Sequence, residues 1–193
     1  MKLHLESSSS MNKQLLKREL VRMSQYTDHV LAYIRLNSMS TDYLFAQVEI
    51  DSLILYAIRL FSSDFITKKI AVDFTKTNKV ILTDEKWFLF IIEQILSNAL
   101  KYSNQGTIHI YLEDELLCIE DEGIGINESS LKRVFEKGYT GENGHQEKNS
   151  SGLGLYLVNQ ISKQLDLPIS IESKVNKGTK VKIDLRKRRL EMF

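Results

Sequence analysis

The sequence has 193 residues, of which 42% are hydrophobic and 26% charged, and its formal net charge at pH 7 is +1. This length accommodates one domain with a sizeable core and an additional segment. The near-neutral balance gives no general reason to expect nucleic acid or a membrane surface as a partner, and the basic run 186–189 is interpreted as a solvated tail.

The single cysteine, Cys118, lies in an apolar run and is predicted to be a buried, inert thiol, which fits a reducing compartment. The apolar runs are too short to span a bilayer, and no signal-peptide pattern opens the chain. We therefore expect this stretch of sequence to be soluble and cytoplasmic.

A heptad pattern marks the N-terminal part. Its positions are spaced alternately by four and three residues: Leu16, Leu20, Met23, Thr27, Val30 and Ile34. This spacing is typical of a helix that packs against a partner helix, and a helix lying on its own domain is an equal alternative. Residues 37–42 are predicted to be a linker, so we divide the chain into a helical region, 1–40, and a second domain, 41–193.

Helices and strands are mixed in the first half of the second domain. Residues 47–50 alternate like a short strand, and Asp51 is predicted to cap a helix whose apolar positions continue to Phe65. Two strands are predicted at 70–74 and 79–82. Thr83 or Asp84 then caps a long helix that ends near Tyr102.

In the second half, a strand at 108–112 and its hairpin partner at 116–119 precede a short helix at 128–135. A polar loop at 138–151 is interpreted as a mobile lid. A helix at 153–165 and strands at 168–173 and 179–185 follow. Because strict βαβ alternation is missing, the pattern predicts an α+β fold, a two-layer sandwich.

The long helix has one polar face and one apolar face. At about 100° per residue, four polar side chains share a face: Gln94, Asn98, Lys101 and Tyr102. Ile91, Ile95 and Ala99 lie on another face. The pattern indicates a helix that packs on one side and forms a ligand wall on the other.

Three glycine clusters follow this helix: Asp121-x-Gly123-x-Gly125-Ile126, Gly152-Leu153-Gly154-Leu155 and Gly178-Thr179. None of them matches GxxxxGK[ST] or GxGxxG. Singly, each cluster is no more than a turn signal.

In this order, the helix and the clusters resemble the sequence boxes of the Bergerat nucleotide-binding fold, the ATP-binding superfamily of gyrase, Hsp90, MutL and sensor histidine kinases. The N box is 94–102, the G1 box 121–126, the F box 134–137 and the G2 box 152–155, and Gly178-Thr179 matches the last box. The resemblance covers about residues 49–185 and implies ATP and Mg²⁺ as cofactors.

The resemblance also implies a role for each position. Asp121 would accept a hydrogen bond from the adenine amino group, and Asn98 would offer its oxygen to Mg²⁺ as the metal ligand. The catalytic residues implied are Gln94, Asn98 and Lys101. The cofactor-binding residues implied are Asn98, Lys101, Tyr102, Asp121, Gly123, Gly125, Ile126, Phe135, Lys137, Gly152, Leu153, Gly154, Leu155 and Thr179.

Gln94 favours one branch of this superfamily. The ATPase branches carry a glutamate four residues before the metal-binding asparagine, where it activates water. Gln94 cannot act as a base at neutral pH, and phosphoryl transfer to a histidine needs no activated water. The resemblance therefore favours a sensor histidine kinase, although Glu93 leaves a displaced base open.

The resemblance extends to the N-terminal region. Residues 1–6, 7–10 and 11–37 resemble the end of a first helix, a turn and the second helix of a kinase dimerisation hairpin. No histidine of the sequence has the context of a phospho-acceptor, so we expect that histidine upstream of Met1. Residues 83–87, 92–102 and 133–141 resemble intramembrane-sensing kinases of Gram-positive bacteria, which respond to cell-envelope antibiotics such as bacitracin.

The implied function is transfer of the ATP γ-phosphoryl to a histidine and then to a response-regulator aspartate. The implied partners are ATP, the regulator, a second copy of the chain and an ABC transporter, without nucleic acid, and the intact protein is expected in a bacterial membrane. Two alternatives stay open: an ATP-hydrolysing relative, and a degenerate nucleotide-binding scaffold.

Overall fold

The computed structural model describes residues 43–141 and 151–186 continuously, together with residues 16, 20, 23–24, 27, 29–34 and 36. The chain divides into two compact units, Met1–Thr41 and Asp42–Phe193. In the first unit the described positions are helical, and the Thr27 hydroxyl donates a hydrogen bond to the Met23 carbonyl at 2.8 Å. The predicted linker, 37–42, lies outside the described residues.

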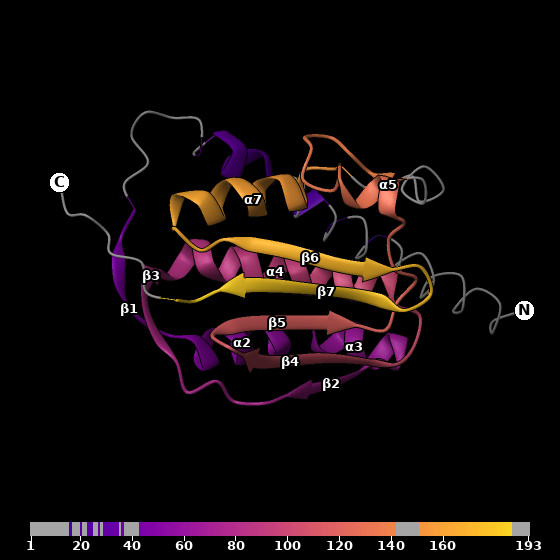
Figure 1. The fold of residues 1–193 in the computed structure, drawn as a ribbon, viewed down its shortest axis with the longest axis horizontal. Helices are drawn as coiled ribbons and strands as arrows, with labels where there is room; N and C mark the ends of the chain where they lie inside the picture. The colour runs from indigo at the N-terminus through magenta and orange to yellow at the C-terminus, as the bar shows by residue number, and fades with distance from the viewer. Residues whose placement is uncertain are drawn as a thin grey trace, which may run out of the picture. The chain divides into compact units, whose positions relative to one another are not determined.

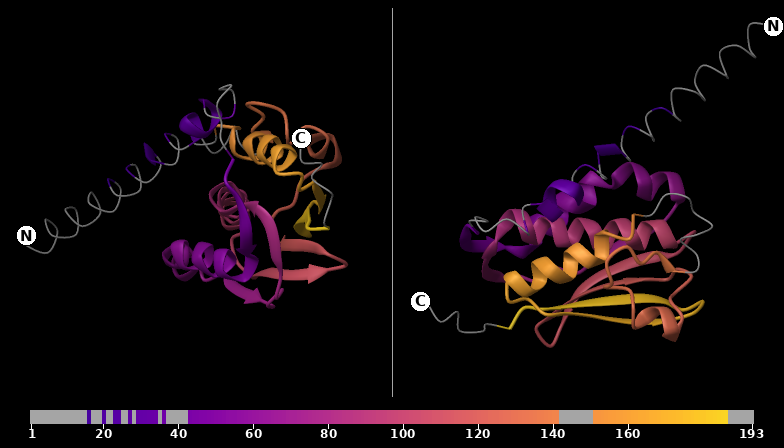
Figure 2. Two further views of the ribbon diagram at one scale, coloured as in Figure 1. Left: turned by 90° about the vertical axis from the view of Figure 1, so that its left-hand side faces the viewer. Right: turned by 90° about the horizontal axis from the view of Figure 1, so that it is seen from above.

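The second unit is an α+β sandwich, as predicted, with helices on one face of a mixed sheet (Figures 1 and 2). Its elements are β1 (Phe45–Glu49), α2 (Ile50–Leu60), α3 (Ser62–Lys68), β2 (Ala71–Phe74), β3 (Val80–Asp84), α4 (Glu85–Tyr102), β4 (Thr107–Glu113), β5 (Leu116–Asp121), α5 (Glu128–Leu131), α7 (Gly154–Gln164), β6 (Ile169–Lys174) and β7 (Gly178–Asp184). The five-stranded sheet has the order β2-β4-β5-β7-β6, in which β2 and β4 are parallel and the other pairs antiparallel. β1 and β3 form a separate antiparallel pair.

Helix α4 is the centre of the core. Its apolar face packs against α2, α7 and β5. Eight of its side chains are buried: Trp87, Phe88, Ile91, Ile92, Ile95, Leu96, Ala99 and Leu100. The sheet supplies inward-facing residues at alternate positions, such as Ile108 and Ile110 of β4, because successive strand residues point to opposite faces. The buried stripe fixes the rotation of α4 and so fixes where its polar face lies.

Asp84 caps α4, which decides between the two predicted capping residues. Its carboxylate accepts hydrogen bonds from the Trp87 N–H at 3.0 Å and from the Leu44 N–H at 2.8 Å. The Thr83 hydroxyl is buried and has no hydrogen-bond partner in the described part of the chain. The cap therefore ties the start of α4 to the residue that leads into β1.

Three local predictions were wrong. Asp51 does not cap α2, because its carboxylate instead accepts hydrogen bonds from Thr77 and Asn78 at 2.6–2.9 Å and holds the turn before β3. The helix predicted to continue to Phe65 breaks at Phe61, whose backbone leaves the helical conformation, and α3 begins at the next residue. The helix predicted over 128–135 ends at Leu131 and continues as turns.

Cys118 is fully buried, as predicted, and burial raises the pKa of its thiol.

Among the described residues, no helix combines the length and the apolar character needed to cross a membrane.

Candidate functional site

The predicted boxes meet where α4 and β5 end and β7 begins, on the right-hand side of Figure 1. The Ile124 N–H donates a hydrogen bond to the Tyr102 carbonyl at 3.1 Å, which joins the G1 loop to the last turn of α4. A Cβ atom on Gly178 would collide with the Asp121 carbonyl oxygen, so the final glycine lies directly against the end of β5. Three boxes that are far apart in sequence are therefore in contact.

Asp121 is a buried carboxyl group at the end of β5. Its side chain is 8% exposed, and its Oδ1 accepts a hydrogen bond from the Gly123 N–H at 2.8 Å. Burial raises its pKa to about 6, against the opposing effect of backbone hydrogen bonds from Gly123 and Thr179. A Cβ atom on Gly123 would lie 2.7 Å from this carboxylate, so glycine is needed there for the close approach.

Ser173 joins the G1 loop to the last box, and the sequence analysis missed it. Its hydroxyl accepts a hydrogen bond from the Ile126 N–H at 2.8 Å and donates one to the Gly178 carbonyl at 2.7 Å. It also lies 2.9 Å from the Thr179 hydroxyl. No sequence signal marks Ser173, because its importance comes from the β6–β7 register, in which it faces Thr179.

The G2 box lies against the N box at the start of α7. A Cβ atom on Gly154 would be only 2.9 Å from Gln94 Oε1, so the glycine leaves room for the amide. Gly152, at a φ of +65°, packs against Gly138, whose N–H donates a hydrogen bond to the Gly152 carbonyl at 3.0 Å. The two ends of the predicted lid therefore meet, while residues 142–150 lie outside the described part.

The F box forms a tight cluster before the lid. Val134 is buried, Phe135 is half-buried and Lys137 is exposed. The Tyr139 hydroxyl donates a hydrogen bond to the Ser130 hydroxyl at 2.8 Å, and the Arg133 guanidinium lies 4.4 Å from the Tyr139 ring centroid. These contacts fix the chain where the lid begins.

The polar face of α4 borders the same region. Gln94, Asn98, Lys101 and Tyr102 are all half-buried, while the apolar face is buried, in agreement with the predicted faces. The Lys101 ammonium lies 4.8 Å from the Tyr102 ring centroid. An amide oxygen and an ammonium group are therefore available one turn apart on this helix.

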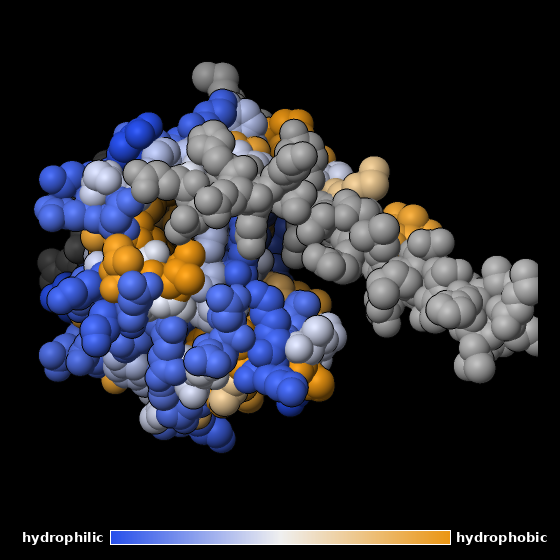
Figure 3. All heavy atoms as spheres, turned by 90° about the vertical axis from the view of Figure 1, so that its right-hand side faces the viewer, coloured by the Kyte–Doolittle hydropathy of each residue, from blue (hydrophilic) through white to orange (hydrophobic). Residues whose placement is uncertain are grey.

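Figure 3 views the side on which the β6–β7 turn and α5 lie in Figure 1, and there an apolar patch interrupts a mostly hydrophilic surface. Ile124, Ile126, Phe135 and Leu153 are partly exposed in this region of the fold, and Val175 is 51% exposed.

A buried carboxylate beside close-packed glycines and apolar side chains fits a purine base. The Asn98 amide oxygen, with phosphate oxygens, fits the donor set that Mg²⁺ prefers.

Solved structures share this fold. The Acinetobacter baumannii histidine kinase AdeS matches with a TM-score of 0.70 and 20% identity over 91% of this chain and 84% of that chain. Histidine kinase ThkA in complex with the response regulator TrrA matches with a TM-score of 0.70 and 19% identity over 92% of this chain and 51% of that chain. Full-length ShkA in complex with AMPPNP has a TM-score of 0.67 and 21% identity, covering 81% and 34% of the two chains. The fold is that of the histidine kinase catalytic domain.

The sequence comparisons are more specific. Residues 83–189 match the family described as histidine kinase-, DNA gyrase B-, and HSP90-like ATPase. The sensor protein kinase GraS of Staphylococcus aureus strain JH1 is 40% identical over 177 residues, covering 89% of this chain and 51% of the relative. The chain belongs to this ATPase family, and sensor histidine kinases are its relatives within it. It spans about half the length of the curated relatives it matches.

Proposed function

We propose that residues 42–193 bind ATP with Mg²⁺ and serve as the catalytic part of a sensor histidine kinase. The γ-phosphoryl passes to a histidine of the intact kinase and then to an aspartate of a response regulator. The observation that carries the proposal is the buried carboxylate of Asp121, placed beside the glycine loop at the end of β5.

The base end of the site lies around Asp121. Its carboxylate accepts a hydrogen bond from the adenine amino group and disfavours the guanine carbonyl at the same place, because two acceptors repel. Gly123, Gly125 and Ile126 bring the backbone close to the ring. Tyr102 flanks the base from α4, and Thr179 steadies the strand through its contact with Ser173.

The phosphate end lies along α4 and the start of α7. Mg²⁺ on the Asn98 oxygen would neutralise the charge that develops on the transferred phosphoryl group. Lys101 adds a positive charge one turn further on. Gly152, Leu153, Gly154 and Leu155 present backbone N–H groups at the start of α7, where the helix dipole favours phosphate. Phe135 and Lys137 approach the nucleotide from the F box.

Transfer to a histidine is favoured over hydrolysis by the residue at position 94. Gln94 lies against Gly154, beside the start of α7, and an amide cannot remove a proton from water at neutral pH. It orients the γ-phosphoryl without activating water. The similarity to the sensor protein kinase GraS supports kinase activity, and the ThkA–TrrA complex supports a response regulator as partner.

The intact kinase is proposed to be a membrane protein that dimerises through the helical region 1–40. Residues 83–87, 92–102 and 133–141 resemble intramembrane-sensing kinases. This resemblance suggests cell-envelope stress as the stimulus and an ABC transporter as a partner. We place this chain on the cytoplasmic side, where ATP and the regulator are available.

Titration of the chain with ATP, followed by calorimetry, tests nucleotide binding. Asp121→Asn should weaken ATP binding at least about tenfold, because the asparagine amide turns a donor towards the adenine amino group. Glu120→Gln is the matched control: Glu120 precedes Asp121 in β5 but bonds to Tyr111 on the opposite face. Equal ATP affinity in wild type and Asp121→Asn would contradict the assignment of the base site.

Labelled ATP separates the kinase from the hydrolase. The chain is mixed with a dimerisation hairpin from a related sensor kinase that carries the phospho-accepting histidine. Label should reach the hairpin in an acid-labile, base-stable form, and little phosphate should be released. Rapid Mg²⁺-dependent release of phosphate by the chain alone would replace the kinase with an ATPase, and Glu93→Gln would test the displaced base.

A further inference from the structure

Lys68 is a half-buried cation that none of the sequence boxes includes. It is the last residue of α3, and its ammonium group reaches the far end of α4. There it donates hydrogen bonds to the carbonyl oxygens of Leu100 at 2.5 Å, Lys101 at 3.3 Å and Ser103 at 3.3 Å. One side chain therefore gathers three backbone acceptors at the point where the chain leaves the helix.

These carbonyls need such a partner. The last carbonyls of an α-helix have no N–H group ahead of them, and the negative end of the helix dipole lies among them. An ammonium group donates hydrogen bonds to these carbonyls, and its positive charge offsets the negative end of the dipole. Such charge-assisted hydrogen bonds are stronger than those between neutral groups. Lys68 thus fixes the last turn of α4 from a neighbouring helix.

The same turn carries the base end of the nucleotide site. Between the bonded carbonyls, the Tyr102 carbonyl accepts the hydrogen bond from Ile124 that anchors the G1 loop. A Cβ atom on Gly123 would lie 2.9 Å from the hydroxyl of Ser103, the buried residue at which the helix ends. A shift of this turn would therefore move Tyr102 and the loop that follows Asp121.

We propose that Lys68 is a positioning residue for the base end of the nucleotide site. It clamps residues 100–103, which in turn set the position of Tyr102 and of the G1 loop. Asn98 and the start of α7 lie outside the clamped turn, and Lys101 is the one proposed phosphate contact inside it, so Lys68 acts mainly on the base end of the site. This inference rests on the proposed ATP site, which it deepens.

The test compares Lys68→Met with Lys69→Met. Lys69 is the next residue and is exposed, and within the described ranges its ammonium group makes no hydrogen bond or ion pair. Binding of ATP with Mg²⁺ and of ADP without Mg²⁺ is measured by calorimetry. Lys68→Met should raise both dissociation constants, each by about tenfold, because most of the affected contacts are to the base, which ATP and ADP share. Lys68→Arg, which keeps the charge and the donors, should restore most of the affinity.

A second readout is local and needs no nucleotide. Amide hydrogen exchange of Ile124 should accelerate in Lys68→Met, while Ile119 in the middle of β5 keeps its wild-type protection. Unchanged affinity in Lys68→Met, an equal loss in Lys69→Met, or faster exchange throughout the sheet would each overturn the inference. If the wild type binds no ATP, the proposed function fails, and the exchange of Ile124 still decides whether Lys68 clamps the turn.

Discussion

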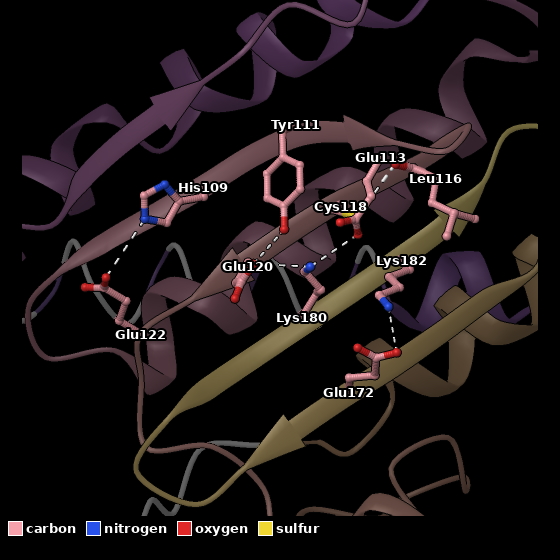
Figure 4. Close-up of polar contacts among 10 residues, drawn as sticks. All are labelled: His109, Tyr111, Glu113, Leu116, Cys118, Glu120, Glu122, Glu172, Lys180 and Lys182. Atoms are coloured by element: carbon pink, nitrogen blue, oxygen red, sulfur yellow. Dashed lines mark hydrogen bonds and ion pairs between the residues drawn. The ribbon is translucent and has the colours of Figure 1, made fainter.

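Two adjacent carboxyl groups in β5 have different surroundings because their side chains point to opposite faces of the sheet. Asp121 points into the helix-covered side and is buried, while Glu120 lies on the open face. There Glu120 accepts a hydrogen bond from the Tyr111 hydroxyl at 2.8 Å and lies 3.6 Å from the Lys180 ammonium (Figure 4). Each pair on this face is partly exposed and contributes less than about 1 kcal/mol. The open face thus carries paired charges, and the buried carboxyl group proposed to bind the base lies on the other side.

The pH dependence of ATP binding should report on Asp121. Burial raises its pKa to about 6, so only about a tenth of the molecules carry the carboxylate at pH 5. Since the ionised form accepts the adenine amino proton, ATP affinity should increase about tenfold between pH 5 and pH 7.5 and then level off. Calorimetric titration across this range measures it. In Asp121→Asn the dependence should vanish, and a persisting slope would assign it to another group.

The same group should act on stability with the opposite sign. Because the folded-state pKa of Asp121 is raised above its ordinary value, the folded protein holds this proton more tightly than the unfolded chain. The contribution of Asp121 to the free energy of unfolding is therefore fully present at low pH and is lost as the pH rises through about 6. Nucleotide-free protein should gain stability above this pH when Asp121 is replaced by Asn.

For single helices and strands, sequence patterns correctly predicted the features that depend on residues close together in the chain. The hairpin of β4 and β5 and the Asp84 cap follow from alternation and capping chemistry within a few residues. The error at Asp51 has a tertiary cause, since its partners, Thr77 and Asn78, lie about 26 residues away. The break at Phe61 was missed because apolar spacing continues through it.

The cap of α4 gives a prediction at this scale. Asp84→Ala should lower the free energy of unfolding by about 1–2 kcal/mol, because the N–H groups of Trp87 and Leu44 lose their acceptor. Thr83→Val removes a buried hydroxyl that has no partner among the described residues, so it should leave stability unchanged or raise it. Urea denaturation of both variants measures this. A larger loss for Thr83→Val than for Asp84→Ala would contradict the capping geometry.

The entry to β7 gives a second prediction. Gly178 has a φ of +97°, and a Cβ atom there would collide with the Asp121 carbonyl. Gly178→Ala should therefore destabilise the domain by about 3 kcal/mol or more. Gly138, at a φ of +78°, has nothing within 4 Å of a Cβ atom, so Gly138→Ala should lose only about 1 kcal/mol from backbone strain. Equal losses in thermal denaturation would show that the close contact at Gly178 is unimportant.

The whole molecule consists of two units with different surfaces. In the first unit, four residues of the predicted heptad pattern are between 57% and 67% exposed: Leu16, Leu20, Met23 and Ile34. In the second unit, eight side chains of α4 are buried, although the β1–β3 pair exposes Phe45, Val80 and Leu82. An exposed apolar seam at heptad spacing favours association with a second copy of the helix.

Sedimentation measures this association. The full chain should self-associate with increasing concentration, and residues 42–193 alone should stay monomeric. Leu20→Asp should abolish association, because a charge in the seam cannot be buried without a partner. Ile66→Asp is the matched control, since Ile66 is 78% exposed in α3, outside the seam. Loss of association in Ile66→Asp, with none in Leu20→Asp, would place the interface on the second unit.

For the proposed site as a whole, the sequence predicted a set of residues but not their arrangement. The order of the boxes indicated an adenine nucleotide, because each box carries a recognisable glycine, amide or carboxylate. It did not indicate Ser173 or Lys68, whose partners are backbone atoms brought close only by folding. Contacts of this kind do not depend on a characteristic residue type or spacing, so they cannot be predicted from the sequence and are seen only in the folded structure.

The position of β7 in the sheet has a consequence for synthesis of the chain. Of the described strands it is the last along the chain, yet it lies between β5 and β6, not at an edge. Until residues 178–184 leave the ribosome, β5 and β6 each present an unpaired edge, and the loop after Asp121 lacks its neighbour, Gly178. A nascent chain that stops before this strand therefore cannot assemble the site, whatever it has already folded. Pairing of β7 with β5 and β6 therefore brings Gly178 against the loop after Asp121 and completes the proposed nucleotide site.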